Sequence, residues 1–144
     1  MYGYDDLTPP QCDWSQYEID ISHFCEKRAD VCTAIAVIGA DRLTYYKRTL
    51  RTLAKNKLAH QLPVYTFLDW PAYSQTPEED QKAMVAETLV HFPNAHIICR
   101  DVNFGCGRNI IDARRQLFDH LEYKKVFIIE DDMLLSDNYL QLCM

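Results

Sequence analysis

The sequence predicts an α/β domain built on a parallel β-sheet with helices on both faces. Four short, β-rich apolar runs alternate with segments whose apolar residues recur at helical spacing, and this alternation is typical of parallel α/β proteins. The first run, residues 31–40, is apolar without strict alternation, as expected of a strand buried on both faces. At 144 residues, 48% hydrophobic and 25% charged, the chain has the size and composition of one packed domain.

The predicted elements follow one another in a regular order. We expect strands near residues 32–39, 63–68, 96–100 and 125–130. We expect helices over 41–60, 76–91 and 107–123, and a short one after 133. Thr76 is the candidate N-cap of the second helix, with Pro77 at its first position. Inward-facing residues of the third are expected to be Ile110, Ile111, Leu117, Phe118 and Leu121. Right-handed crossovers and a ligand crevice where the winding reverses predict the strand order 3-2-1-4.

Residues 1–29 differ from the rest of the chain. Thr8-Pro9-Pro10 interrupts regular structure, and residues 14–28 are a candidate short helix. Its apolar face would hold Tyr17, Ile21, Phe24 and Cys25. We therefore divide the chain into an N-terminal extension, residues 1–29, and a domain over residues 30–144.

Charge and composition exclude several classes of function. A net charge of −6 argues against a nucleic-acid-binding protein, which usually has a basic surplus. The N-terminus is acidic and lacks an apolar run, so no signal peptide is expected. No apolar stretch is long enough for a transmembrane segment. The six cysteines form no CxxC pair, and Cys32 and Cys99 lie in strand-like runs, where cysteine packs as a small hydrophobic residue. We expect reduced cysteines, no zinc site and a cytoplasmic protein.

The carboxyl ends of parallel strands meet at one edge of the sheet, where ligands bind. Three of the chain's four glycines follow the predicted strand ends, where the backbone turns sharply. Two arginines, Arg42 and Arg100, and several carboxylates are also there. The four segments concerned are residues 39–42, 69–70, 100–103 and 130–132. We therefore expect a ligand site at this edge.

The acidic triplet Glu130-Asp131-Asp132 ends the fourth apolar run. Its three carboxylates repel one another, and no arginine or helix N-terminus adjoins them in sequence. A divalent cation would relieve the repulsion, and hard oxygen ligands suit Mg²⁺ or Mn²⁺. A solvated acidic turn that begins a helix is the alternative. The position of the triplet at the end of a central strand favours the metal site.

Two further residues at this edge each have two interpretations. Asp69 can accept a hydrogen bond from a base or ribose, or form an Asx-type turn before Pro71. Arg42 can pair with a diphosphate, or with Asp41 or Glu87 on the surface.

Taken together, these motifs resemble those of GT-A-type glycosyltransferases over residues 31–144. The motifs are Asp41-Arg42 after the first strand, Asp69 after the second, Asn103-x-Gly105-x-Gly107-x-Asn109, and the acidic triplet. Asp41-Arg42 and the acidic triplet are most similar to the N-acetylglucosaminyltransferases that extend N-glycans. The Asn-x-Gly-x-Gly loop is more similar to bacterial family 2 transferases.

The resemblance implies a Rossmann-like GT-A sheet that binds a UDP-sugar. Asp132 would ligate Mn²⁺ or Mg²⁺, which holds the donor's diphosphate, and Arg42 would contact the phosphates. Asp69 would contact uracil, and Glu130 and Asp131 the sugar and ribose. The donor-binding residues would be Ala40, Asp41, Arg42, Asp69, Asn103, Arg108, Glu130 and Asp131.

In these families the acceptor site and the catalytic base lie well beyond the acidic motif. The sequence reaches Met144, twelve residues after Asp132. We therefore expect no catalytic base within this chain, a base located beyond Met144, and a GT-A domain truncated after the triplet. Such a chain would bind donor without transferring sugar, unless it pairs with a downstream acceptor half. The acceptor itself is unknown.

Three other classes of protein share parts of this pattern. A non-catalytic α/β nucleotide-binding or interaction domain is the main alternative. A response-regulator receiver has a similar acidic strand end but needs further βα units after it. A nucleotidyltransferase usually has a glycine-rich basic loop after its first strand, and residues 39–42 match that loop poorly.

Overall fold

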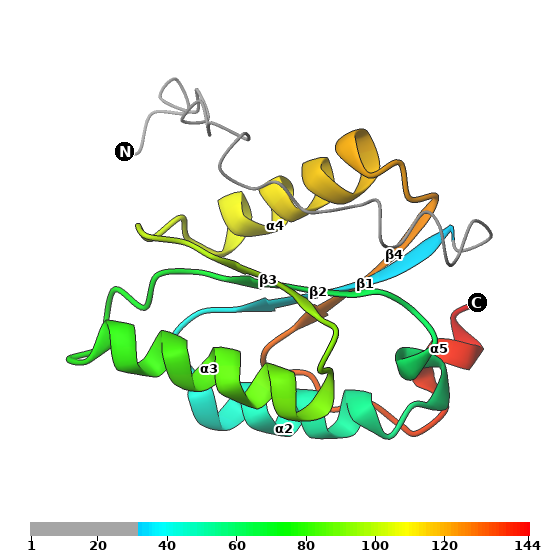
Figure 1. The fold of residues 1–144 in the computed structure, drawn as a ribbon, viewed down its shortest axis with the longest axis horizontal. Helices are drawn as coiled ribbons and strands as arrows, with labels where there is room; N and C mark the ends of the chain where they lie inside the picture. Colours follow the sequence, from blue (N-terminus) through cyan, green and yellow to red (C-terminus); the bar gives the residue numbers. More distant parts are fainter. Residues whose placement is uncertain (1–31) are drawn as a thin grey trace.

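The computed structural model describes residues 32–144. Several predictions therefore lie outside the described residues: the candidate helix over 14–28, Cys12, Cys25 and the boundary near residue 30. Its strands are β1 (Thr33–Gly39), β2 (Val64–Leu68), β3 (His96–Cys99) and β4 (Lys125–Glu130). They form one sheet in the order β3-β2-β1-β4, and every neighbouring pair is parallel. The predicted α/β class and strand order are confirmed (Figure 1).

Helices cover both faces of this sheet. Figure 1 shows α2 and α3 on one face and α4 on the other. The helical elements are α2 (Leu43–Ala54), the 3₁₀ turn η3 (Lys57–His60), α3 (Pro77–His91), α4 (Cys106–Arg114), the π-helical turn η4 (Arg115–His120) and α5 (Tyr139–Leu142). None of the helices in this part of the chain is long and apolar enough to cross a membrane.

The position of β1 in the sheet explains why its sequence lacks a strict alternation of apolar and polar residues. All seven of its residues are buried, because β1 lies between β2 and β4 and contributes to a core on each face. Ile35 and Val37 belong to the core under α2 and α3. Ala34, Ala36 and Ile38 belong to the core under α4. The small alanines leave room on that side for larger side chains of β2.

Two helix boundaries differ from the prediction. The helix expected over 41–60 ends at Ala54 and is followed by the separate turn η3. Asn56 lies at the break, where its amide donates to the Ser136 carbonyl (3.1 Å) and accepts from the Leu140 N–H (3.2 Å). This side chain therefore fastens the C-terminal segment to the domain instead of continuing the helix.

The predicted cap of α3 is also wrong in detail. The helix does begin at Pro77, but Thr76 makes no side-chain capping bond. The Ser74 hydroxyl accepts from the Thr76 N–H (2.9 Å) and donates to Asp80 in the first turn (2.6 Å). A hydroxyl two residues earlier therefore organises this helix start.

The buried face of α4 and η4 is partly polar, which the sequence pattern did not indicate. Its buried residues recur at helical spacing and are Asn109, Asp112, Ala113, Gln116 and Leu117. Of the residues predicted to face inward, Ile111 is 57% exposed, and Phe118 is only half-buried and lies with Ile111 on the outward side. Polar residues that bond to the buried Arg100 occupy the inner stripe, so Ile111 lies on the opposite face.

Candidate functional site

The loops after β1 and β4 bring a cation to the acidic triplet. Ile38 and Glu130 are paired in the parallel ladder, so the two strands end side by side. Arg42 forms an ion pair with Asp131, and its Nη1 donates to Asp132 Oδ2 at 3.2 Å. Two surface partners were considered for Arg42, namely Asp41 and Glu87. In the described part of the chain, neither of them pairs with Arg42. An arginine therefore does contact the acidic triplet, and it comes from a loop about ninety positions away in sequence.

Asp131 is the buried member of this cluster. Burial raises the pKa of its carboxyl group, while the charge of Arg42, its hydrogen bond and a bond from the Ala40 backbone oppose that rise. The Thr49 hydroxyl on α2 lies 2.8 Å from the carbonyl oxygens of both Asp131 and Met133. Helix α2 therefore holds the backbone of the triplet in place.

The three carboxylates of the triplet point to different places. Glu130 is exposed, with Oε2 4.0 Å from Cys106 Sγ at the start of α4. Asp131 faces Arg42, and the Asp132 side chain is 47% exposed, as is that of Arg42. Within residues 32–144, no group of three or more His, Cys, Asp or Glu side chains could hold a metal ion.

This donor set fits only one kind of metal site. Mg²⁺ commonly takes one or two protein carboxylates and completes its shell with phosphate and water oxygens. Asp132 offers one accessible carboxylate beside the cationic Arg42. The described residues therefore do not form a preformed cage, and a cation held by Asp132 would need phosphate and water oxygens for the rest of its shell.

Asp69 has a different role from the expected contact with uracil. The residue is 2% exposed. Its Oδ1 accepts from the N–H groups of Trp70 (2.9 Å) and Phe104 (2.7 Å), and its Oδ2 accepts from the Gly105 N–H (2.8 Å). Gly105 has a φ of 75°, which glycine adopts without steric cost. The carboxylate is thus directed at backbone and joins the loops after β2 and β3.

Asn103 and Arg100 complete this second cluster. The Asn103 amide donates to the Trp70 carbonyl at 2.7 Å and adds a second link between the two loops. Arg100 does not reach the edge of the sheet, contrary to expectation. It is buried, forms an ion pair with Asp112, and lies 4.7 Å from the ring centroid of Phe104. The arginine therefore supports the loop from behind.

The predicted site residues fall into two groups. Ala40, Arg42, Asp131 and Asp132 form one cluster at the ends of β1 and β4. Asp69 and Asn103 hold the loops after β2 and β3. Asp41 is partly exposed, and Arg108 is exposed with its guanidinium 5.4 Å from the Phe104 ring centroid. Sequence reasoning missed the structural role of Thr49, because a threonine inside a helix carries no signal of its own.

Met144, beyond which the catalytic base was expected, lies away from the acidic triplet. Its side chain is exposed, and its carbonyl accepts from Lys125 Nζ at 3.5 Å. Lys125 begins β4 and Glu130 ends it, so Met144 is beside the opposite end of that strand. A chain continuing past Met144 would have to return along β4, about 17 Å at 3.3 Å per residue, to bring a base to the triplet. The base beyond Met144 stays a prediction.

The four cysteines that the structure describes form no cluster at the site. Cys32, Cys99, Cys106 and Cys143 are free and exposed. The prediction that Cys32 and Cys99 pack as small hydrophobic residues is therefore wrong. Cys32 precedes β1, and Cys99 is the last residue of an edge strand.

Comparisons with known proteins do not identify a relative: no protein-family model, curated protein or solved structure matches this chain. Its function is therefore inferred from its residues and their geometry.

Proposed function

We propose that the domain binds a UDP-sugar at the ends of β1 and β4, as the donor-binding part of a GT-A-type glycosyltransferase. The observation that carries the proposal is the pair formed by Arg42 and Asp132, both 47% exposed at the side chain. The pair lies between β1 and β4, where the winding of the sheet reverses. In open α/β sheets this crevice is where ligands bind.

Arg42 would receive the donor's phosphates. A guanidinium group binds phosphate through paired, charge-assisted hydrogen bonds, and it does so with the same N–H groups that now contact the acidic triplet. Moving those bonds to phosphate would free Asp132. Glu130, exposed on the other side of the strand end, is the carboxylate available to the sugar hydroxyls.

Asp132 would hold Mn²⁺ or Mg²⁺ together with the diphosphate. When bound, the cation would stabilise the negative charge that develops as the nucleoside diphosphate departs. Arg42 would stabilise the same charge from the opposite loop. Asp69 enters the proposal only as the clamp of the loops after β2 and β3, because its carboxylate is directed at backbone N–H groups.

Isothermal titration of the whole chain with UDP tests the proposal. We expect binding with Mn²⁺ or Mg²⁺ and none in EDTA. Asp132→Asn should weaken binding by at least roughly ten- to a hundredfold, the loss seen when only an outer-shell partner of a metal ligand is removed, and by more than Asp131→Asn. Asp137→Asn, an exposed residue five positions on, is the control and should leave affinity unchanged.

Two results would contradict parts of this assignment. Cation-independent binding, or an Asp132→Asn variant with normal affinity, would remove the metal site. A preference for adenine over uridine nucleotides would remove the assignment of UDP.

The second candidate is a non-catalytic α/β interaction domain. It is favoured by one observation, namely that Arg42 already neutralises part of the acidic triplet. On this view the Arg42–Asp131 pair only joins two loops. No nucleotide would then bind with or without cation, so the same titration separates the two functions.

A further inference from the structure

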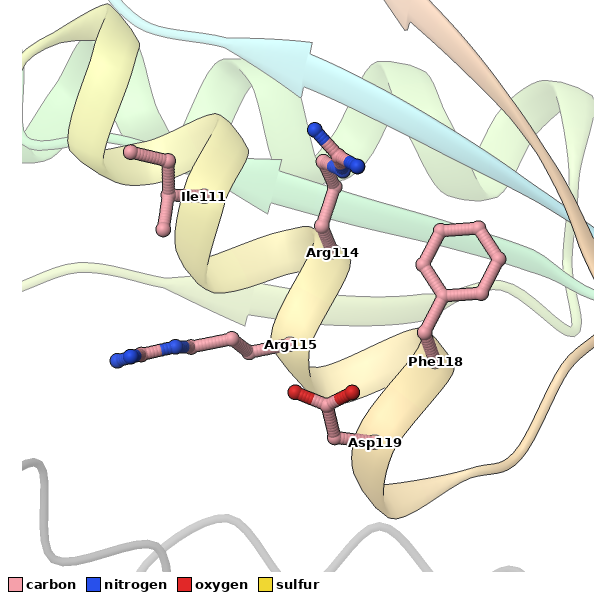
Figure 2. Close-up of a pocket in the computed structure, with 5 residues that line it drawn as sticks. All are labelled: Ile111, Arg114, Arg115, Phe118 and Asp119. Carbon is pink, nitrogen blue, oxygen red and sulfur yellow. The ribbon is translucent and has the colours of Figure 1, made fainter.

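The outward face of α4 and η4 carries a hollow. Its volume is about 410 Å³, and it is lined by Ile111, Arg114, Arg115, Phe118 and Asp119. Figure 2 shows these five side chains along one stretch of the helix. Ile111 is 57% exposed. Neither Arg114 nor Arg115 forms an ion pair with another residue of the described part. We call this surface the α4 face.

We propose that residues 14–28 of the same chain, here called the N-terminal segment, dock on the α4 face. The first reason is where the chain enters the domain. The Lys124 N–H donates to the Cys32 carbonyl at 2.9 Å, so residue 32 lies beside the short connection from η4 to β4. Only residues 29–31 separate it from the segment, and each residue spans at most about 3.6 Å. The attachment therefore keeps residue 28, the last of the segment, within about 14 Å of Cys32.

The second reason is length and pattern. Residues 14–28 number fifteen, as do residues 106–120 of α4 and η4. As α-helices, both would be about 22 Å long. If the segment is helical, Trp14, Tyr17, Ile21 and Phe24 fall on one stripe beside Cys25, with Ile19 on the other side. Such a stripe would extend about 15 Å, enough to cover the roughly 10 Å of helix between Ile111 and Phe118.

The third reason is the order of charges along the two elements. Element η4 runs toward the amino-terminal edge of the sheet because it leads into β4, and a docked segment that leads into β1 would run the same way. The first 26 residues contain six acidic side chains and no lysine or arginine, and Lys27 and Arg28 follow. The α4 face has the reverse order, with Arg114 and Arg115 before Asp119. In a parallel arrangement of equal length, Lys27 and Arg28 would lie beside Asp119, with Glu26 at the same end, and Glu18 and Asp20 would lie about one turn before Arg114 and Arg115.

Hydrogen exchange of the full-length chain, followed by mass spectrometry, tests this docking. In the wild type we expect the amides of residues 14–28 to be protected. Arg115→Glu should accelerate their exchange roughly tenfold, equivalent to about 1.4 kcal/mol. Adding Glu18→Lys and Asp20→Lys to that variant should restore protection. Ile111→Glu should act like Arg115→Glu, which makes the apolar contact a separate test.

Controls identify the source of each change. Arg51→Glu reverses an exposed charge on α2, which lies on the other face of the sheet, and should have no effect. Exchange in β1 reports whether each variant is folded. Unprotected residues 14–28 in the wild type would overturn the proposal. The proposal would also be overturned if residues 14–28 were protected equally in the wild type, Arg115→Glu and Ile111→Glu. Protection that disappears on dilution, together with a dimer by light scattering, would assign the α4 face to a second copy and also overturn it.

Discussion

Replacing Asp69 with asparagine separates a structural role from a ligand-binding role. The Asp69 carboxylate accepts three backbone N–H groups, from Trp70, Phe104 and Gly105. An asparagine keeps one acceptor oxygen, which can serve Trp70 and Phe104. Its NH₂ group then faces the Gly105 N–H, so two donors oppose each other in a buried place. The surviving two bonds also lose their charge assistance.

The magnitude follows from these contacts. Hydrogen bonds to charged groups contribute about 1.5–3 kcal/mol each, and an unsatisfied buried donor costs about 1–3 kcal/mol. We therefore expect Asp69→Asn to lower the free energy of unfolding by about 3 kcal/mol, without any nucleotide present. With an m value of about 2 kcal/mol/M, the urea midpoint falls by about 1.5 M.

Urea denaturation followed by circular dichroism measures this change, and Asp101→Asn is the matched control. Asp101 is exposed in the loop that Asp69 clamps, so its midpoint should not move. The reasoning is refuted if Asp69→Asn has the wild-type midpoint. A variant with the wild-type midpoint that nonetheless loses affinity for UDP would instead support the uracil contact implied by the family resemblance.

Two further substitutions probe the buried charges. Because burial raises the pKa of Asp131 above that of an unfolded aspartate, its contribution to stability is present in acid and is lost as pH rises through the raised pKa. Asp131→Asn should therefore raise the urea midpoint at pH 7, with the gain disappearing below about pH 4; a gain that persists in acid would contradict this. Arg100→Met leaves the Asp112 carboxylate buried without its cation, and should cost about 3–5 kcal/mol. Arg100→Met with Asp112→Asn should cost less than Arg100→Met alone, and a larger loss in the double variant would contradict the pairing.

The fold was predictable because it depends on patterns that are local in sequence. Four apolar runs separated by helical periodicity define the strands, and handedness restricts their order. The inner face of α4 was not predictable in this way. A prediction that assigned the apolar residues of α4 to its inner face placed Ile111 inward. The buried Arg100 needs polar partners, however, and Asp112 and Asn109 lie on the inner face and bond to it. A buried arginine cannot be recognised until its distant partners are known.

The site was half predictable for the same reason. Residues at strand ends could be located, since parallel strands bring their carboxyl ends together. Which side chains pair there could not be, because Arg42 and Asp131 are separated by 89 positions. The acidic triplet was expected to need a cation for charge balance, and a protein guanidinium supplies part of that balance. Asp69 was expected to contact a ligand, and the amides it binds lie 35 and 36 positions away.

These two clusters make different demands on a ligand. The Asp69 cluster is internally satisfied and needs nothing from outside to hold its loops. The Arg42 cluster pairs one guanidinium with two carboxylates, one of them buried. A diphosphate that draws Arg42 away would leave Asp131 and Asp132 uncompensated, and a divalent cation bound alone at Asp132 would lie beside the positive charge of Arg42. The two together would come closer to balance, because a cation held by Asp132 would offset the charge that Arg42 would give up there on binding the phosphates. The charges of the cluster therefore predict that nucleotide and cation bind cooperatively, each raising the affinity for the other by the same factor.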